Sequence, residues 1–96
     1  MFEWDARKAD ANRATHGVSF DEATTAFGDP HALDGPDLRH SDKESRFPRL
    51  DRAPPGRLLI VACTVRRQGN DQTIRIISSR QASRKERAAY APSSAD

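Results

Sequence analysis

The chain is short of the residues that cross-link a protein or build a large core. One of its 96 residues is cysteine, one is tryptophan and one is tyrosine, and 35% are hydrophobic. A lone Cys63 cannot form an internal disulfide and has no partner at zinc spacing, so we expect a reducing compartment and no structural metal. The length allows one core, and we expect a single domain over residues 1–91 with a frayed tail at 92–96.

Long hydrophobic runs are missing as well. No stretch approaches the roughly 20 apolar residues that span a bilayer. Residues 1–10 contain three acidic side chains and no apolar run, which argues against a signal peptide. We therefore expect a soluble, cytoplasmic protein without a membrane partner.

The net charge is small, but it is unevenly distributed. The total is +2, yet residues 1–48 carry 6 basic and 10 acidic side chains, whereas residues 49–96 carry 10 basic and 4 acidic ones. Thirteen of the 16 basic residues are arginine, whose planar guanidinium matches phosphate geometry and stacks on bases. This pattern favours a polyanionic partner. The alternative is an arginine excess that follows from base composition and decorates a solvated surface.

The N-terminal residues predict a short strand followed by a helix. Phe2–Trp4 alternates apolar and polar side chains, as an edge strand does. Asp5 is a suitable N-cap for a helix over residues 6–15, which is rich in alanine and long polar side chains. Gly17 is placed to end that helix in the left-handed conformation.

A second helix is predicted directly after the first. Ser19-Phe20-Asp21-Glu22 matches a capping box, with Val18 and Ala23 at the positions of a hydrophobic staple. Gly28-Asp29-Pro30 is expected to terminate this helix. Its phenylalanines, Phe20 and Phe27, share one face and are expected to pack on the core.

The remaining residues predict strands and one more helix. Residues 31–34 suggest a brief strand and residues 35–44 an exposed loop. Residues 46–50 suggest a further strand, which Pro48 would restrict to an edge or a bulge.

The clearest strand signal is the continuous apolar run at residues 58–63, which we expect at the centre of the sheet. Residues 73–79 are expected as its antiparallel partner across a loose loop at residues 66–72. A capping box at Ser83 predicts a last helix that ends at about Tyr90. Together these elements predict an α+β fold with two N-terminal helices, a mainly antiparallel β-sheet and a C-terminal helix.

Several strings resemble one family over nearly the whole chain. The opening signature of the BrnT toxin family is similar to Phe2-Glu3-Trp4-Asp5, Lys8, Asn12 and His16-Gly17-Val18-Ser19-Phe20. Its second half is similar to Gly56-Arg57-Leu58-Leu59, Ile74-Arg75-Ile76-Ile77-Ser78-Ser79-Arg80 and Ser83-Arg84-Lys85-Glu86-Arg87 with Tyr90. The resemblance implies a compact RelE-like fold, a ribonuclease that cleaves RNA and arrests translation, and a cognate ribbon-helix-helix antitoxin (BrnA-like). It also implies that the toxin–antitoxin complex binds operator DNA.

A ribonuclease of this class needs to move protons and to neutralise a phosphate. The ribose 2′-hydroxyl attacks the neighbouring phosphorus, so acid–base groups and cations suffice. His16, His31 and His40 lack the close carboxylate or thiolate partners of a zinc site, and no metal or cofactor is expected. Histidine is the side chain type that ordinarily changes charge near neutral pH, so His16 is the candidate for proton transfer, with a capping role at the helix end as the alternative.

The first helix carries a polar stripe. Lys8, Asn12 and His16 are four residues apart, which aligns them on one side of a helix. We interpret this stripe as the wall of a groove in which Lys8 neutralises the scissile phosphate. An ordinary solvated lysine is the alternative for Lys8.

Two arginines in the second half complete the predicted catalytic site. Arg75 interrupts an apolar strand, and Arg80 ends that strand just before a helix N-terminus, where a phosphate is favoured. We expect both beside Lys8 and His16; an ion pair with a helix carboxylate is the alternative for each arginine. The expected RNA-binding residues are Asn12, Arg46, Arg57, Arg84, Arg87 and Tyr90. Arg87 and Tyr90 are expected on the same side of the last helix, where Tyr90 either stacks on a base or anchors the core.

Two other classes of function stay open at this point. A noncatalytic nucleic-acid-binding module, such as a degenerate toxin, would show salt-dependent binding without cleavage. A pure interaction partner would use its basic face to receive an acidic or hydrophobic segment of an antitoxin. We favour a ribonuclease toxin that is silenced by a partner covering its positive face.

Overall fold

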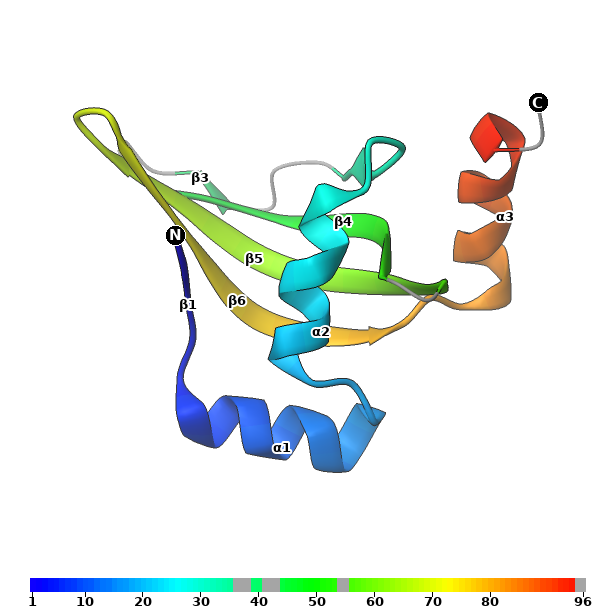
Figure 1. Ribbon diagram of the computed structural model, residues 1–96, viewed down its shortest axis with the longest axis horizontal. Coiled ribbons are helices and arrows are strands. Elements are labelled where there is room, and N and C mark those ends of the chain that lie inside the picture. The colour runs from blue at the N-terminus through cyan, green and yellow to red at the C-terminus, as the bar shows by residue number, and fades with distance from the viewer. Residues whose placement is uncertain (36–38, 41–43, 54–55, 95–96) are drawn as a thin grey trace.

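The computed structural model describes residues 1–35, 39–40, 44–53 and 56–94. It is an α+β fold in which three helices surround one twisted sheet (Figure 1). In chain order the elements are β1 (Phe2–Glu3), α1 (Ala6–His16), α2 (Phe20–Thr25), a 3₁₀ turn (Ala26–Gly28), β2 (Leu33–Asp34), β3 (Arg39–His40), β4 (Glu44–Ala53), β5 (Arg57–Gln68), β6 (Asp71–Gln81) and α3 (Arg84–Ser94).

The sheet is mixed but mainly antiparallel, as predicted. Its strands follow the order β1-β6-β5-β4-β2, and β3 also pairs with β4. Only β1 runs parallel to its neighbour, with Phe2 opposite Ile74 and Glu3 opposite Arg75. The apolar run of β5 lies at the centre of the sheet, so its predicted position is confirmed.

The two faces of the sheet are covered differently. Side chains alternate between the faces of a strand, and the odd-numbered residues Leu59, Val61 and Cys63 of β5 are fully buried. They pack with Val18, Phe20, Ala23, Ala26, Ala53 and Ile76 in the main core. We call this side the helix face, because α2 crosses it in Figure 1. On the opposite side, the open face, a smaller cluster consists of Leu50, Leu58, Ile60, Ala82 and Tyr90.

The predicted helix signals at the N-terminus are confirmed. Asp5 caps α1 by accepting hydrogen bonds from the backbone N–H groups of Arg7 and Lys8. Gly17 ends this helix with a φ of 69°, a conformation that a side chain would strain. Ser19 caps α2 by accepting from the Glu22 N–H at 3.1 Å. Val18 and Ala23 are both buried, which agrees with the predicted staple.

Two expectations about the second half are wrong. The strands of the β5–β6 hairpin continue to Gln68 and Asp71, so the connection is a tight two-residue turn and not a loose loop. Gly69 has a φ of 59° and Asn70 has no positive φ, which is the pattern of a type II′ turn that matches strand twist. The last helix also continues beyond Tyr90, through Pro92 to Ser94.

The middle of the chain is more regular than its composition suggested. The brief strand at residues 31–34 is confirmed as β2, whereas β4 is longer than residues 46–50 and begins at Glu44. The expected exposed loop contains β3, while its residues 36–38 and 41–43 lie outside the described residues. Pro48 is tolerated within β4 because its carbonyl accepts from the Gly35 N–H at 2.8 Å. The N–H and C=O groups of one strand residue point to the same side. The position of the N–H that Pro48 lacks therefore also faces away from β5.

The side chain of Asn12 joins α1 to the exposed edge of β6. Its Nδ2 donates to the carbonyls of Ser79 and Val18 at 2.7 and 2.9 Å, and its Oδ1 accepts from the Ser79 N–H at 3.0 Å. The side-chain amide of Asn12 thus makes the hydrogen bonds with the Ser79 backbone that a neighbouring strand would make at this point of the β6 edge. The groove stripe predicted for α1 is wrong at its centre, because Asn12 is only 8% exposed and points at the sheet.

We expect Asn12→Ala to lower the free energy of unfolding by about 2–4 kcal/mol, because it leaves buried backbone groups of Ser79 and Val18 without partners. Urea denaturation measures the change. Thr15→Ala, at an exposed position of the same helix, is the matched control and should change stability by less than about 0.5 kcal/mol. A loss for Asn12→Ala as small as that of the control would contradict this role.

A buried ion pair lies on the helix face of β4. Asp51 is fully buried, and Nε of Arg49 donates to its Oδ2 at 2.7 Å. The Asp51 Oδ1 has no hydrogen-bond partner among the described residues. The guanidinium of Arg49 lies 4.6 Å from the ring centroid of Phe27 and 3.4 Å from an oxygen of Asp34. Burial raises the pKa of Asp51 to about 6, although Arg49 opposes the rise.

This carboxyl group should make stability depend on pH. Its pKa is about 6 in the folded state against 3.8 as the ordinary value, so its stabilising contribution is full below about pH 4 and is lost as the pH rises through 6. Relative to Asp51→Asn, the wild type should lose roughly 3 kcal/mol of unfolding free energy between pH 4 and pH 7. Urea denaturation across this range tests the difference. Asp71→Asn, at the exposed hairpin end, should keep the wild-type slope, and an equal slope for Asp51→Asn would disprove the assignment.

Candidate nucleic-acid interface

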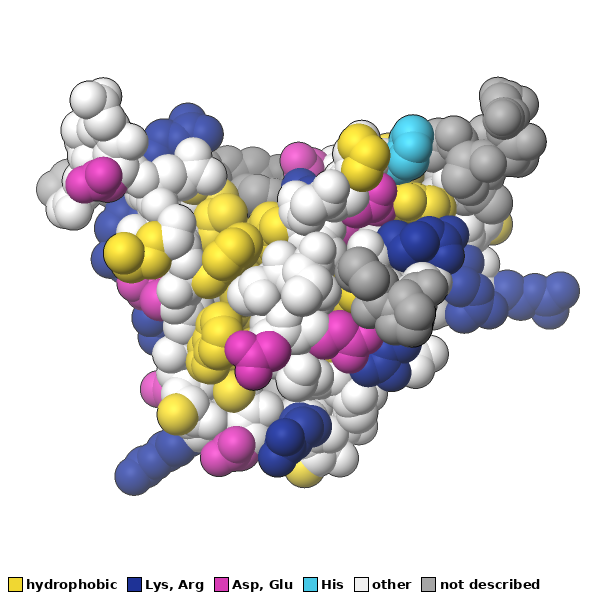
Figure 2. All heavy atoms as spheres, in the orientation of Figure 1, with side chains coloured by type: hydrophobic (Ala, Val, Ile, Leu, Met, Phe, Trp, Pro, Cys, Tyr) yellow, Lys and Arg dark blue, Asp and Glu magenta, His cyan; other side chains and the backbone are white. Residues whose placement is uncertain are grey.

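Basic side chains gather at the end of the molecule where β6 passes into α3. The strand ends and helix start that meet there bring together Arg52, Arg57, Arg80, Arg84, Lys85 and Arg87, which we call the basic end. In Figure 2 a group of dark blue Lys and Arg side chains lies on the right side of the molecule, where Figure 1 places α3, and further ones lie along the left edge. Other basic residues of the second half, Arg66 and Arg67, are exposed at the opposite, hairpin end of the sheet.

Arg80 is fixed by an ion pair with the last helix. Its Nη1 and Nη2 donate to the two carboxylate oxygens of Glu86 at 2.7 and 2.9 Å, and Nη1 also lies 3.2 Å from the Gln81 carbonyl. This is the helix-carboxylate pair considered as an alternative. A guanidinium has five N–H donors, so the Nε–H and one Nη2–H of Arg80 are left over by these three bonds.

Glu86 has a second duty as the predicted capping-box residue of α3. Its Oε1 accepts from the Ser83 N–H at 2.8 Å, while Ser83 Oγ accepts from the Glu86 N–H at 3.2 Å. Arg80 is the main cause that lowers the pKa of Glu86 to about 2. One carboxylate thus connects the end of β6 with the beginning of α3.

Arg57 lies at the same end but on the helix face. Its guanidinium makes a two-point contact with the carboxylate of Glu22 and donates to the Gly17 carbonyl at 3.0 Å. The contact with Glu22 raises the pKa of Arg57. Since Gly17 directly follows His16, the end of α1 is brought to the basic end.

Lys8 and His16 are both exposed, but they occupy opposite ends of α1. Eight residues of helix separate their Cα atoms by about 12 Å. Because Glu3 pairs with Arg75 and Asn12 pairs with Ser79, α1 follows the edge of β6 in the same direction as the strand. His16 therefore belongs to the basic end, whereas Lys8 lies nearer the level of Arg75.

Arg75 is distant from Arg80 although both lie on the open face of β6. Five strand residues separate them by roughly 15 Å. Arg75 Nη1 pairs with Glu3 Oε2 at 2.7 Å, so its partner comes from β1 and not from a helix. The register places Arg46 opposite Thr64, which is in turn opposite Arg75. The four predicted catalytic residues are thus not gathered around one point.

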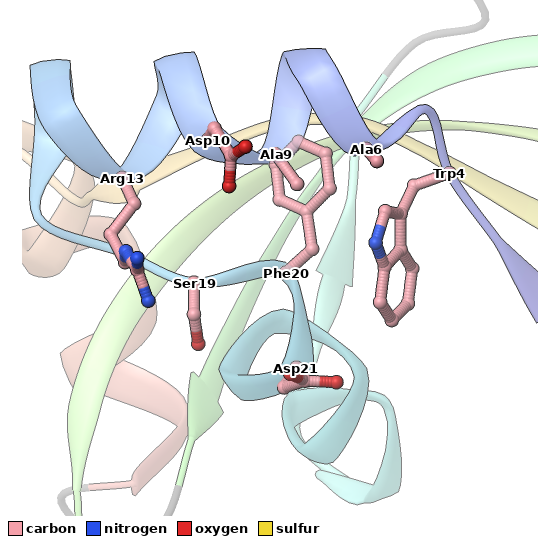
Figure 3. A pocket seen from close by; sticks show the side chains of 8 residues that line it. All are labelled: Trp4, Ala6, Ala9, Asp10, Arg13, Ser19, Phe20 and Asp21. Carbon is pink, nitrogen blue, oxygen red and sulfur yellow. The ribbon is translucent and has the colours of Figure 1, made fainter.

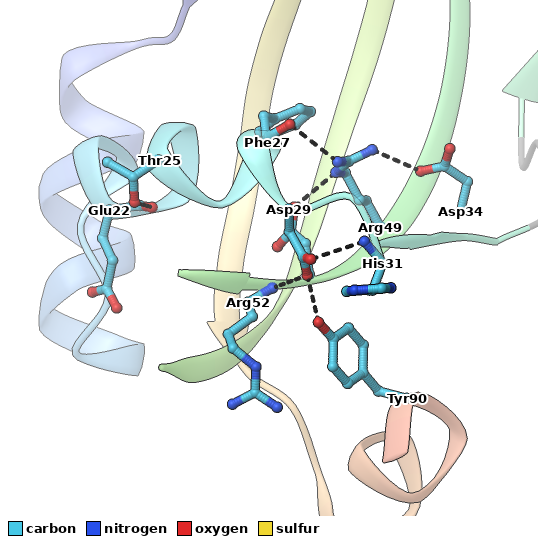
Figure 4. Close-up of polar contacts among 10 residues, drawn as sticks. Glu22, Thr25, Phe27, Asp29, His31, Asp34, Arg49, Arg52 and Tyr90 are labelled. Carbon is cyan, nitrogen blue, oxygen red and sulfur yellow. Dashed lines mark hydrogen bonds and ion pairs between the residues drawn. The ribbon is translucent and has the colours of Figure 1, made fainter. Parts of the chain in front are cut away.

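Tyr90 anchors the core, which is the alternative considered for it. The tyrosine is 2% exposed, and its hydroxyl donates to Asp29 Oδ2 at 2.8 Å (Figure 4), whereas Arg87 is exposed. Of the two, Arg87 alone is exposed, because the apolar ring of Tyr90 packs in the smaller core cluster. Burial and the hydrogen bond to Asp29 raise the pKa of Tyr90.

Asp29 was not singled out in the sequence, yet it connects three segments. Its carboxylate accepts from the backbone N–H groups of His31 and Arg52, both at 2.9 Å, as well as from Tyr90. Burial opposes ionisation of Asp29, but these donors together lower its pKa. The turn sequence Asp29-Pro30 was the available signal, since aspartate side chains commonly accept hydrogen bonds from backbone groups in turns.

The described residues contain no group of three or more His, Cys, Asp or Glu side chains arranged to hold a metal ion. No helix in the described part of the chain is both long enough and apolar enough to cross a membrane.

The fold, the exposed arginines and the basic end define a small α+β domain suited to a polyanion. Comparison with protein families gives a match over residues 4–86 to the family described as "Ribonuclease toxin, BrnT, of type II toxin-antitoxin system". Since this match covers most of the chain, the protein belongs to the BrnT family of ribonuclease toxins. A cognate antitoxin is the partner that a type II system implies. A search of the curated proteins gives no significant match.

The Glu86 contacts predict a specific acid sensitivity. Glu86→Gln removes a carboxylate whose pKa is about 2 in the folded state and ordinarily 4.5, so its contribution is present above pH 4.5 and is lost as the pH falls toward 2. We expect the variant to have a lower melting temperature than the wild type at pH 7. This difference in melting temperature should be smaller at pH 4 and smaller again at pH 3. Thermal melting of Asp10→Asn, at an exposed helix position, provides the control. A difference independent of pH would rule out this account.

Proposed function

We propose that this protein is the toxin of a type II toxin–antitoxin pair and acts in the cytoplasm as a metal-independent endoribonuclease that arrests translation. The observation that carries the proposal is the basic end, where Glu86 holds Arg80 at the start of α3 and His16 ends α1. Phosphate binding and proton transfer at neutral pH are the two requirements of cleavage through the 2′-hydroxyl.

In this proposal Arg80 binds the scissile phosphate and His16 transfers protons. Glu86 orients the guanidinium, and the donors left over on Arg80 face the phosphate oxygens. A base removes the proton of the 2′-hydroxyl, the 2′-oxygen bonds to phosphorus, and the bond to the 5′-oxygen breaks as that oxygen receives a proton. The products are a 2′,3′-cyclic phosphate and a free 5′-hydroxyl.

The other predicted residues contact the RNA on either side of the cleaved bond. Lys8 and Arg75 lie too far along α1 and β6 for the same phosphate, so we assign them to the flanking backbone. The exposed guanidinium groups of α3, Arg84 and Arg87, extend the basic surface, and we assign the remaining backbone contacts to Arg46 and Arg57. Asn12 and Tyr90 take no part in our proposed RNA contacts, because their polar groups are already occupied within the fold.

The proposal also includes the fold group and the partner. Helices on one face of a mainly antiparallel sheet, with a further helix at its end, support a RelE-like grouping. The antitoxin is a BrnA-like ribbon-helix-helix protein, and the complex of the two binds operator DNA. A basic end with exposed arginines supports silencing by a partner that covers it.

Cleavage of a defined RNA by the purified protein tests the proposal. We expect cleavage to persist in a metal chelator, to stop when the 2′-hydroxyl at the cut site is replaced by hydrogen, and to leave a cyclic phosphate. His16→Ala and Arg80→Ala should each lower kcat by about 100-fold or more, because each removes a group that acts in the transition state. Lys8→Ala and Arg75→Ala should mainly raise KM, because they bind flanking phosphates.

Arg67→Ala, at the exposed hairpin end, is the matched control for the loss of one arginine and should cleave as the wild type does. Thermal melting identifies variants that fail to fold. Full activity of a folded Arg80→Ala variant would overturn the assignment of the site. RNA binding without cleavage by the wild type would overturn the activity and leave a binding module.

A further inference from the structure

A groove between α1 and α2 shares no residue with the basic end. It encloses about 210 Å³ and is lined by Trp4, Ala6, Ala9, Asp10, Arg13, Ser19, Phe20 and Asp21. Figure 3 shows Asp10 and Arg13 descending from α1 toward the first residues of α2, with the Trp4 ring closing one side. The small side chains of Ala6 and Ala9 leave this space open.

The groove combines an apolar floor with polar groups that have no partner among the residues described in the structure. The rings of Trp4 and Phe20 meet edge to face at 6.0 Å. Within the described part of the chain, the Trp4 indole N–H and the side chains of Asp10, Arg13 and Asp21 form no hydrogen bond or ion pair. The basic residues of the interface are different in this respect, since Arg57 and Arg80 are both paired with glutamates.

The charge of the rim selects the kind of ligand. Two carboxylates and one guanidinium line the groove, so its net negative charge disfavours the phosphates of RNA. It fits a peptide segment that places an apolar side chain against Trp4, a lysine or arginine beside Asp10 and Asp21, and an acceptor at the indole N–H. Aromatic rings with apolar area and one polar group are typical anchors of protein interfaces.

We propose that this groove is the anchoring site of the cognate antitoxin, which binds it through a segment with an apolar residue next to a basic one. The inference rests on the proposed function, because it takes the chain to be the toxin of a toxin–antitoxin pair. The site is also placed to affect that function. His16 follows Arg13 by one helical turn on the same side of α1, so a segment seated in the groove continues directly past the proposed proton-transfer group.

Antitoxin binding by groove variants tests the inference. Asp10→Lys and Asp21→Lys should each weaken the affinity of the purified antitoxin by about tenfold, because each replaces an attraction with a like-charge repulsion. Ala6→Leu, which changes an exposed residue, should weaken it by filling the groove without changing the charge. Titration calorimetry measures the affinity. Asp71→Lys makes the same charge reversal at the hairpin end and should bind as the wild type does.

The same variants separate this inference from the proposed ribonuclease. We expect all of them to cleave RNA as the wild type does, and to cause growth arrest that co-expressed antitoxin no longer relieves. Unchanged antitoxin affinity in the folded groove variants would overturn the inference. So would lost RNA cleavage with unchanged antitoxin affinity, or self-association of the wild type that the variants abolish. If the wild type binds antitoxin through the groove but cleaves no RNA, the proposed function fails and the inference stands.

Discussion

The amide group of Asn12 is the contact on which the arrangement of the helices depends. The parallel strand β1 covers β6 at only two residues, so the edge beyond Arg75 presents backbone groups that need partners. Asn12 supplies both a donor and an acceptor to Ser79 and also holds the turn carbonyl of Val18. This single side chain fixes α1 along the strand edge, and through that turn it fixes where α2 starts.

Part of the uneven charge of the sequence is neutralised by ion pairs within the molecule. Arg49, Arg57 and Arg75 belong to the basic half of the chain, and each is paired with a carboxylate from the acidic half: Asp34, Glu22 and Glu3 respectively. The asymmetry therefore records complementarity between the two halves as well as affinity for a polyanion. The basic surface left for a ligand is smaller than the sequence suggested, and it includes the exposed Arg84 and Arg87 of α3.

Local signals predicted the elements well, because their causes are local. The Asp5 cap, the Gly17 stop, the Ser19 cap and the capping box at Ser83 all depend on residues within one helical turn, and each is present. At Ser19 the second bond of the box is not formed, because the Glu22 carboxylate pairs with Arg57. The hairpin was misjudged because strand length there depends on pairing across the sheet. Polar residues 66–68 and 71–72 extend the ladder although their sequence has no apolar alternation.

The site was harder to predict because it depends on contacts between distant residues. Asn12 fitted a polar stripe by its spacing, but the tilt of α1 against β6 turns it inward. Lys8 and His16 share that stripe and are still separated by the length of the helix. Asp29 accepts hydrogen bonds from Tyr90, 61 residues away in sequence, and from Arg52, 23 residues away. A local sequence pattern cannot predict contacts between residues so far apart. The family resemblance, by contrast, was readable in the strings themselves and is confirmed over residues 4–86.

The pairing of β1 with β6 sets an order for the assembly of the chain. Strands β4, β5 and β6 are neighbours in sequence and close short loops, so they can form early at low entropic cost. Phe2 meets its partner only at Ile74, and Asn12 meets Ser79. The residues of β1 and α1 therefore wait for those of β6, and the helix face closes only after β6 has been synthesised. A truncated product that lacks β6 has no surface on which α1 and the beginning of the chain can dock.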